Sequence, residues 1–270
     1  MDLSRAKTIL ILVFLALDSI LIYQLYARQQ GDDNYSSLIQ AEIREVQELL
    51  NSERIYLKEE IPMAIPDRPF LRVEKQYYTV QDIENSVSVD IDISQIEIEP
   101  DNEIHYLWAG TGTSGTRLYD VSNGLQDFPK QYLFQGKNYR PYAYMLDNNN
   151  GYIVYLQYYE EYPIFGAVAT AVVNGGKITE GYQNPLMSIE AEDTKRPILA
   201  AATALRRLPS EIEQRPVTIE KIQLGYYSRL NETDSWLLPP VWGIMLDTGE
   251  EFYINAFTGE LEGLQEHIEE

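Results

Sequence analysis

The chain opens with one long apolar segment. Residues 8–26 number nineteen and are largely aliphatic or aromatic. At ~1.5 Å per residue, a helix of this length extends about 28 Å, close to the hydrocarbon thickness of a bilayer. A signal peptide is the competing interpretation, but Leu25 stands where a cleavage site needs a small residue. The pattern therefore predicts an uncleaved, single-pass transmembrane helix over residues 8–26.

Basic residues beside this segment set its predicted orientation. Arg5 and Lys7 precede the apolar residues, and Arg28 follows them. The excess of positive charge on the amino-terminal side places that side in the cytoplasm. We therefore expect a protein of the cell membrane, with a cytoplasmic stub of residues 1–7 and an extracytoplasmic carboxyl-terminal domain.

The apolar period next becomes that of an amphipathic helix. Apolar residues recur at spacings of three and four at Leu38, Ile39, Ile43, Val46, Leu49 and Leu50. Ser36 and Ser37 precede them as candidate helix caps. We expect residues 27–60 to form a juxtamembrane linker and an amphipathic helix that packs on its own domain.

Alternating patterns dominate the next region, residues 61–187. Residues 87–93 and 96–99 place apolar side chains on one face and polar or acidic ones on the other. This alternation is typical of half-exposed antiparallel strands. The sequence Asp-Asn-Asn-Asn-Gly at 147–151 lies between two strand-like runs, which predicts a hairpin turn.

The last region, residues 188–270, begins with a helical pattern. Asp193 or Thr194 is a candidate cap, and Pro209 is the expected end of the helix. Its apolar stripe consists of Ile198, Ala201, Ala202, Leu205 and Leu208. Strands are then expected over residues 217–227, 240–246 and 251–257, with a turn over 247–250. A helix followed by an antiparallel meander is an α+β unit.

A short internal echo suggests that this unit occurs twice. Pro-Ile-Phe-Gly at 163–166 aligns with Pro-Val-Trp-Gly at 240–243, and residues 176–178 align with 259–261. The second spacing is longer, which we interpret as a longer hairpin in the second copy. The predicted architecture is a transmembrane helix followed by two tandem α+β lobes with antiparallel sheets.

Composition excludes several functions. The chain has 21 basic and 42 acidic residues, for a net charge of −21. Such a surface repels phosphate backbones, so nucleic-acid binding is not expected. The absence of cysteine removes thiol nucleophiles, disulfides and Cys-ligated metals. The two histidines, His105 and His267, give little material for a histidine-based site.

Motifs that suggest chemistry fail on their context. Residues 110–115 match G-x-G-x-x-G, but no βαβ pattern surrounds them. The segment from Asp147 resembles a calcium loop, yet its glycine comes at position five and position twelve is Tyr158. Adjacent acids such as Glu250 and Glu251 could serve glycoside hydrolysis, but charged runs are usually solvated. We therefore expect no catalytic residues, no metal and no cofactor.

One acidic residue, Asp18, lies near the middle of the predicted span. A carboxylate at that depth costs at least ~2.5–3.5 kcal/mol on insertion scales. It is either a protonated residue tolerated in a short anchor or a contact to a partner's transmembrane helix. At helical spacing it shares a face with Phe14, Leu21, Ile22 and Leu25, and Ser19, Tyr23 and Gln24 add polar groups nearby.

Both ends of the chain resemble one family. The opening, with its basic stub, Phe14, Leu15 and Asp18, resembles that of the YycI (WalI) family of low-GC Gram-positive bacteria. Residues 224–227, 239–242 and 253–261 look like that family's last domain and, more loosely, like the small α+β PepSY module. The resemblance covers most of the chain.

The resemblance implies a function that is not enzymatic. YycI-like proteins act with a sister protein, YycH, on the sensor histidine kinase WalK (YycG) of an essential cell-wall-homeostasis two-component system, largely through transmembrane helices. The candidate contact residues carried onto this sequence are Phe14, Asp18, Ser19, Leu21, Ile22, Tyr23 and Gln24. The alternative is an extracytoplasmic ligand-binding or inhibitory PepSY-type module that uses the helix only as a tether.

Overall fold

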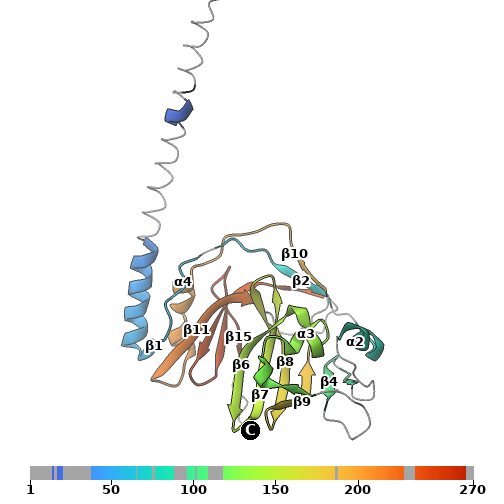
Figure 1. Ribbon diagram of the computed structural model, residues 1–270. Coiled ribbons are helices and arrows are strands. Elements are labelled where there is room, and N and C mark those ends of the chain that lie inside the picture. Colours follow the sequence, from blue (N-terminus) through green and yellow to red (C-terminus); the bar gives the residue numbers. More distant parts are fainter. Residues whose placement is uncertain are drawn as a thin grey trace, which may run out of the picture.

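The computed structural model shows a mixed α+β protein in which a large, mostly antiparallel sheet carries short helices (Figure 1). It describes Phe14 and residues 17–20, 38–64, 66–74, 77–87, 96–100, 102–108, 118–185, 188–227 and 235–265. Within that part of the chain, residues 38–52 form the most amino-terminal helix of the folded domain. We refer to this element as the N-terminal helix.

The other elements fall into two groups in chain order. The first group is β1 (Ile55–Leu57), β2 (Leu71–Glu74), α2 (Val80–Ser86), β3 (Ile96–Ile98), β4 (Ile104–Leu107), β5 (Tyr119–Asp120), α3 (Phe128–Tyr132), β6 (Tyr139–Asp147), β7 (Asn150–Tyr159), β8 (Tyr162–Asn174) and β9 (Lys177–Gln183). The second is β10 (Ser188–Ala191), α4 (Ala201–Leu205), α5 (Leu208–Glu211), β11 (Val217–Tyr226), β12 (Ser235–Leu238), β13 (Pro240–Leu246), β14 (Glu251–Asn255) and β15 (Leu261–Gln265).

The first half of the sheet is the meander β6–β7–β8–β9, which β4 and β3 extend beyond β9. The hairpin predicted at 147–151 is confirmed, since Asp147 pairs with Asn150. Asn148 and Asn149 adopt positive φ values of 48° and 66°, as a tight two-residue turn requires. The strand predicted at 96–99 corresponds to β3, whereas residues 88–93 lie outside the described part.

The second half contains the predicted strands as β11, β13 and β14, but its helix differs from the prediction. Residues 194–200 are not helical, and two short helices, α4 and α5, replace the single one expected. The segment before α4 is held extended because Arg196 exchanges backbone hydrogen bonds with Arg68 and the Leu199 amide donates to Ala256. Pro209 opens α5 instead of ending the helix, as its fixed φ suits a first turn.

The structure does not support the internal sequence repeat, in which residues 163–178 are aligned with residues 240–261. Pro163 and Gly176 are separated by the single strand β8, whereas two strands, β13 and β14, lie between Pro240 and Gly259. Residues 163–176 and residues 240–259 therefore do not contain equivalent strands. The division into lobes at residues 61–187 and 188–270 remains a prediction.

The two halves of the sheet meet at one described backbone pairing, where Tyr226 of β11 lies parallel to Ile164 of β8. Side chains pack over both sides of this junction. On one side, Leu71, Val73 and Leu238 of the small sheet β10–β2–β12 pack against Ile164 and Tyr226.

On the other side lies the cluster that we call the seam layer. Its members come from both halves and are Leu156, Phe165, Val241 and Tyr253, with Tyr142, Tyr158, Val168 and Tyr227 at its margins. Phe165 of β8 is the central residue, and its ring rests on two glycines of the other half. A Cβ at Gly225 or Gly243 would lie 2.5 Å from that ring. The sequence thus uses glycine where the two halves approach most closely.

Each half also buries its own core against helices. The first core gathers around α3 and includes Tyr106, Trp108 and Phe128. The second lies between the sheet and the N-terminal helix, α4 and α5, and contains Leu205 and Trp242. The predicted stripe from Ile198 to Leu208 is buried in it, although its residues belong to three segments and not to one helix.

The close approach at Gly243 gives a test of the seam layer. We expect Gly243→Ala to lower the free energy of unfolding by about 1–3 kcal/mol, because the added methyl group overlaps the Phe165 ring. Denaturant unfolding measures the change. In a Phe165→Leu background, where the ring is absent, the same substitution should cost clearly less. Equal costs in both backgrounds would show that Phe165 is not the residue that requires glycine.

Candidate functional site

The N-terminal helix is the described element of the domain nearest in sequence to the predicted transmembrane span, and its attachment is the candidate functional site. Eleven residues, 27–37, separate that span from residue 38. Val46 and Leu50 are fully buried in the core of the second half, and Ile43 packs against the same cluster. Figure 1 shows the helix beside α4 and β11, at one side of the sheet. Its apolar face therefore fixes it to the second half of the fold.

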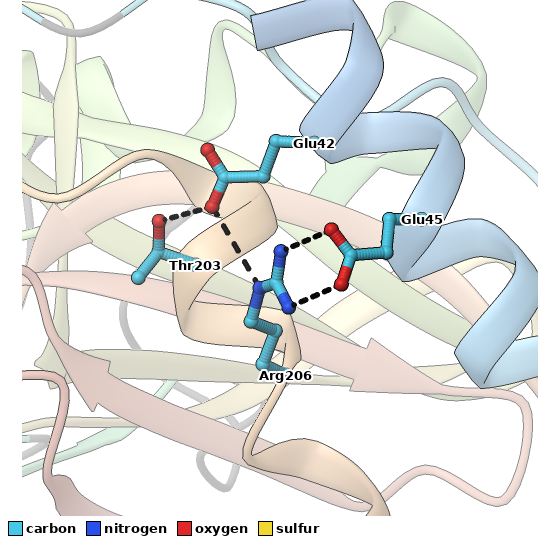
Figure 2. A network of polar contacts seen from close by, with 4 residues as sticks. All are labelled: Glu42, Glu45, Thr203 and Arg206. Carbon is cyan, nitrogen blue, oxygen red and sulfur yellow. Dashed lines mark hydrogen bonds and ion pairs between the residues drawn. The ribbon is translucent and has the colours of Figure 1, made fainter. Parts of the chain in front are cut away.

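A polar network fastens the same helix to α4 and the residues after it (Figure 2). The Arg206 guanidinium donates to both carboxylate oxygens of Glu45, at 3.1 and 3.0 Å. Glu42 accepts a hydrogen bond of 2.8 Å from the Thr203 hydroxyl. The Arg206 Nε atom lies 3.8 Å from a Glu42 oxygen. Glu42 and Glu45 lie on successive turns of the N-terminal helix, and the planar guanidinium group of Arg206 thus contacts both carboxylates.

The network is favourable at neutral pH. Hydrogen bonds from Arg206, and then its charge, lower the pKa of Glu45 below its usual value. A carboxyl group whose pKa is lowered by folding stabilises the folded state above its ordinary pKa. That contribution is lost only as the pH falls through the lowered value. The contribution of Glu45 to the attachment is therefore present in full at neutral pH.

The chain that follows the helix is also joined to the second half. β1 pairs in parallel with β11, with Ile55 opposite Val217. Two ion pairs flank this strand, one between Glu53 and Arg215 and one between Lys58 and Glu220. The helix and the strand after it therefore belong to the second half of the fold, although they precede the first half in sequence.

The residues predicted to contact a partner in the membrane are only partly described. Phe14, Asp18 and Ser19 lie in helical residues and are exposed, Phe14 to 57%. Leu21, Ile22, Tyr23 and Gln24 lie outside the described residues. In the part of the chain that the structure describes, no helix has the length and apolar character needed to cross a membrane. The predicted contact face stays a prediction.

Sequence reasoning missed the residues of the polar network. Glu42 and Glu45 stand at a spacing of three on a helix whose apolar face was recognised, so their shared direction could be inferred. Their partners, Thr203 and Arg206, are 161 residues away, and no local signal connects the two segments. The G-x-G-x-x-G segment at 110–115 is outside the described residues.

The structure also reveals a contact that the sequence reasoning did not find. His105 of β4 lies 2.7 Å from a Glu180 oxygen that also accepts from the Tyr182 hydroxyl at 2.7 Å. The His105 and Tyr182 rings stack at 4.5 Å. Hydrogen bonding from Tyr182 is the main reason why the pKa of Glu180 is lowered. Among the described residues, no group of three or more His, Asp and Glu side chains has a metal-binding arrangement.

Comparison with known proteins identifies the family of this chain. The family model described as "YycI protein" matches residues 33–257, which is most of the sequence. The chain belongs to the YycI family. Membership implies a membrane-associated regulatory protein that is associated with the WalK (YycG) two-component system. The match includes the N-terminal helix and every described strand of the sheet except β15.

Two solved structures match this YycI-family chain at low sequence identity and with TM-scores below 0.5. The Bacillus megaterium YpeB C-terminal domain is 15% identical, with a TM-score of 0.39 over 63% of this chain and 80% of that one. An uncharacterized protein from Eubacterium rectale is 12% identical, with a TM-score of 0.42 over 78% of this chain and 91% of that one. A search among curated proteins found no significant match.

The attachment of the helix can be tested with two neighbouring leucines. Leu50 is fully buried against the second half, whereas Leu49 is 37% exposed. We expect Leu50→Ala to lower the free energy of unfolding by about 2–5 kcal/mol, because it removes buried methyl groups and leaves a cavity. Leu49→Ala, which deletes the same atoms from the same helix, should change stability much less. Similar losses in both variants would contradict the described docking face.

Proposed function

We propose that this YycI-family protein is a non-enzymatic, membrane-anchored regulator that modulates the sensor kinase WalK (YycG) together with YycH. Its transmembrane helix contacts the membrane helices of its partners through Phe14, Asp18, Ser19, Leu21, Ile22, Tyr23 and Gln24. The family match supports the association with this signalling system.

The attachment of the N-terminal helix is the observation that carries this proposal. An element that leads from the predicted span is joined to the outer domain by a buried apolar face, a bidentate arginine and a parallel strand. A flexible tether would not require an attachment of this kind between the helix and the domain. A displacement of the second half of the fold therefore moves the N-terminal helix with it.

The energy required for signalling is small. A coupling of ~1–3 kcal/mol between the outer domain and the kinase changes an equilibrium by about 5- to 150-fold. A contact between transmembrane helices that involves a polar side chain supplies about 1–2 kcal/mol. A single acidic residue in the span is therefore sufficient to bias the balance between kinase and phosphatase states.

Substitution of Asp18 tests the membrane contact. We expect Asp18→Leu to reduce co-purification of the kinase about fivefold or more, since ~1 kcal/mol of interhelical contact is lost. Output of the kinase's regulon should change in the same cells. Asp18→Asn retains a hydrogen-bonding group and serves as the matched control, with equal amounts of each variant in the membrane fraction. Unchanged co-purification and unchanged output in Asp18→Leu would refute the proposed contact.

A separate experiment distinguishes the alternative of an outer module on a passive tether. A secreted fragment of residues 31–270 lacks the predicted span. We expect it not to restore the phenotype of a strain in which the full-length protein is deleted, because coupling through the span is absent. Full restoration by this fragment would favour an extracytoplasmic ligand-binding or inhibitory module.

A further inference from the structure

Two buried polar atoms, from Arg68 and Tyr226, lie where the halves of the fold join. Tyr226 is only 1% exposed, and its hydroxyl has no hydrogen-bond partner among the described residues. The Nε atom of Arg68 is also buried and has no partner in that part of the chain. The charge of Arg68 acts on the Tyr226 hydroxyl, so the two groups are neighbours. Since buried polar groups are normally hydrogen-bonded, these two atoms mark a candidate binding site.

Tyrosine rings surround this pair of atoms. The central guanidinium carbon of Arg68 lies 3.9 Å from the centroid of the Tyr162 ring, and the Nη2 atom of Arg68 donates to the Tyr162 hydroxyl. The rings of Tyr159 and Tyr162 pack edge-on against the Tyr226 ring, and each centroid is 6.4 Å from that of Tyr226. Backbone hydrogen bonds between Arg68 and Arg196 hold the arginine in place. The candidate site is thus lined by aromatic side chains around one fixed cation.

The polar groups of Arg68, Tyr162 and Tyr226 can all donate hydrogen bonds. An arginine Nε–H group is a donor only. The Tyr162 hydroxyl accepts from Arg68, which leaves its own hydrogen available for donation. Burial raises the pKa of Tyr226, so this hydroxyl also keeps its hydrogen at neutral pH. A group that satisfies the site must therefore accept several hydrogen bonds.

The charge of the site selects a singly charged acceptor. None of the ion pairs between described residues includes Arg68. Glu160, an acid whose charge acts on Tyr226, is exposed, and its described hydrogen bond is accepted by its backbone oxygen from Arg140. The net charge of −21 repels ligands that carry several negative charges. One carboxylate group, with two acceptor oxygens, matches one arginine and its tyrosine donors.

We propose that Arg68, Tyr162 and Tyr226 bind the carboxylate of a small ligand whose remaining part is apolar or aromatic. The carboxylate accepts from the Nε–H group of Arg68 and from the two hydroxyls. The apolar part of the ligand packs on the partly buried residues of the same cluster, which include Ile189 and Trp236. The ligand enters past Arg68 and Tyr162, whose side chains are half-buried. Both a free carboxylic acid and the carboxyl terminus of a peptide have this chemistry.

The proposed site lies at the junction between the two halves. Tyr226 is the β11 residue that pairs with Ile164 of β8, and Tyr162 begins β8. A ligand held by Tyr162 and Tyr226 therefore contacts both halves at once. Because a ligand stabilises the arrangement that binds it, occupancy strengthens the junction. The site is additional to the function proposed above and does not depend on the membrane contact.

Saturation-transfer NMR titrations of the full-length protein in mild detergent at pH 7 test the site, with phenylacetate as the probe. Phenylacetamide has the same ring without the charge and is the matched control for binding to detergent or to apolar surface. We expect phenylacetamide to bind about tenfold more weakly or less, because hydrogen bonds to a charged group are lost. Inorganic phosphate at the same ionic strength should not displace phenylacetate. Absent binding of phenylacetate, equal binding of the amide or displacement by phosphate would overturn the proposal.

A further probe distinguishes the two sources of the carboxylate. N-acetylphenylalanine presents the carboxyl terminus of a peptide on the same aromatic ring. Tighter binding of this compound than of phenylacetate would support the site and assign it to a peptide end. Weaker binding would support the site and assign it to a free acid.

Two variants with matched controls locate the bound probe. We expect Tyr226→Phe and Arg68→Gln each to weaken phenylacetate binding about tenfold or more. Tyr155→Phe removes another buried hydroxyl that has no described partner, and Arg72→Gln removes an arginine whose side chain is 52% exposed. Both controls should bind phenylacetate as the wild type does. Tyr226→Phe keeps its ring and loses no described hydrogen bond, so it should fold even if Arg68→Gln does not. Unchanged affinity in Tyr226→Phe, or an equal loss in the controls, would show that phenylacetate binds elsewhere and would refute the site.

Discussion

Packing of Phe165 on Gly225 and Gly243 is the constraint on which the arrangement of this fold depends. Two antiparallel meanders share one described residue pair, so backbone hydrogen bonds contribute little to their mutual orientation. Side chains must supply the rest, and they do so on both sides of the junction. Because Gly225 and Gly243 have no Cβ atom, the Phe165 ring approaches their backbones more closely than it could approach residues with side chains. Packing at that density has few alternative solutions, so the orientation is well defined.

The constraint also bears on the helix attachment to which we assign function. The N-terminal helix is fixed to one half by Val46, Leu50 and the Arg206 network, and hence any movement at the seam is a movement of the other half relative to that helix. In the function proposed above, a rearrangement of the seam layer therefore changes how the first half lies relative to the element that leads from the predicted span.

Local sequence patterns predicted most of the strands and the hairpin. The errors occur where contacts between residues distant in sequence determine the structure. Alternation and turn chemistry found β11, β13, β14 and the Asn148–Asn149 hairpin because those signals lie within a few residues. The helix expected from Asp193 fails because backbone bonds to Arg68 and Ala256, distant in sequence, hold residues 196–199 extended. The apolar periodicity correctly indicated that this segment is buried, but not that its backbone is extended. Of the candidate site, the apolar face of the N-terminal helix was predictable, whereas Arg206 and Thr203 were not, since only the folded chain brings them to Glu42 and Glu45.

The parallel pairing of β1 with β11 has a consequence for the order in which the molecule assembles. Contacts such as that between Glu53 and Arg215 close a loop of 162 residues, and the whole first half of the sheet lies within that loop. During synthesis the N-terminal helix emerges first, yet its binding surface is completed only when β13 and β14 are available. The first meander is then complete in the nascent chain before the N-terminal helix can dock on its core. A nascent chain of this topology passes through a stage in which the amphipathic N-terminal helix stays exposed until the last quarter of the polypeptide has been synthesised.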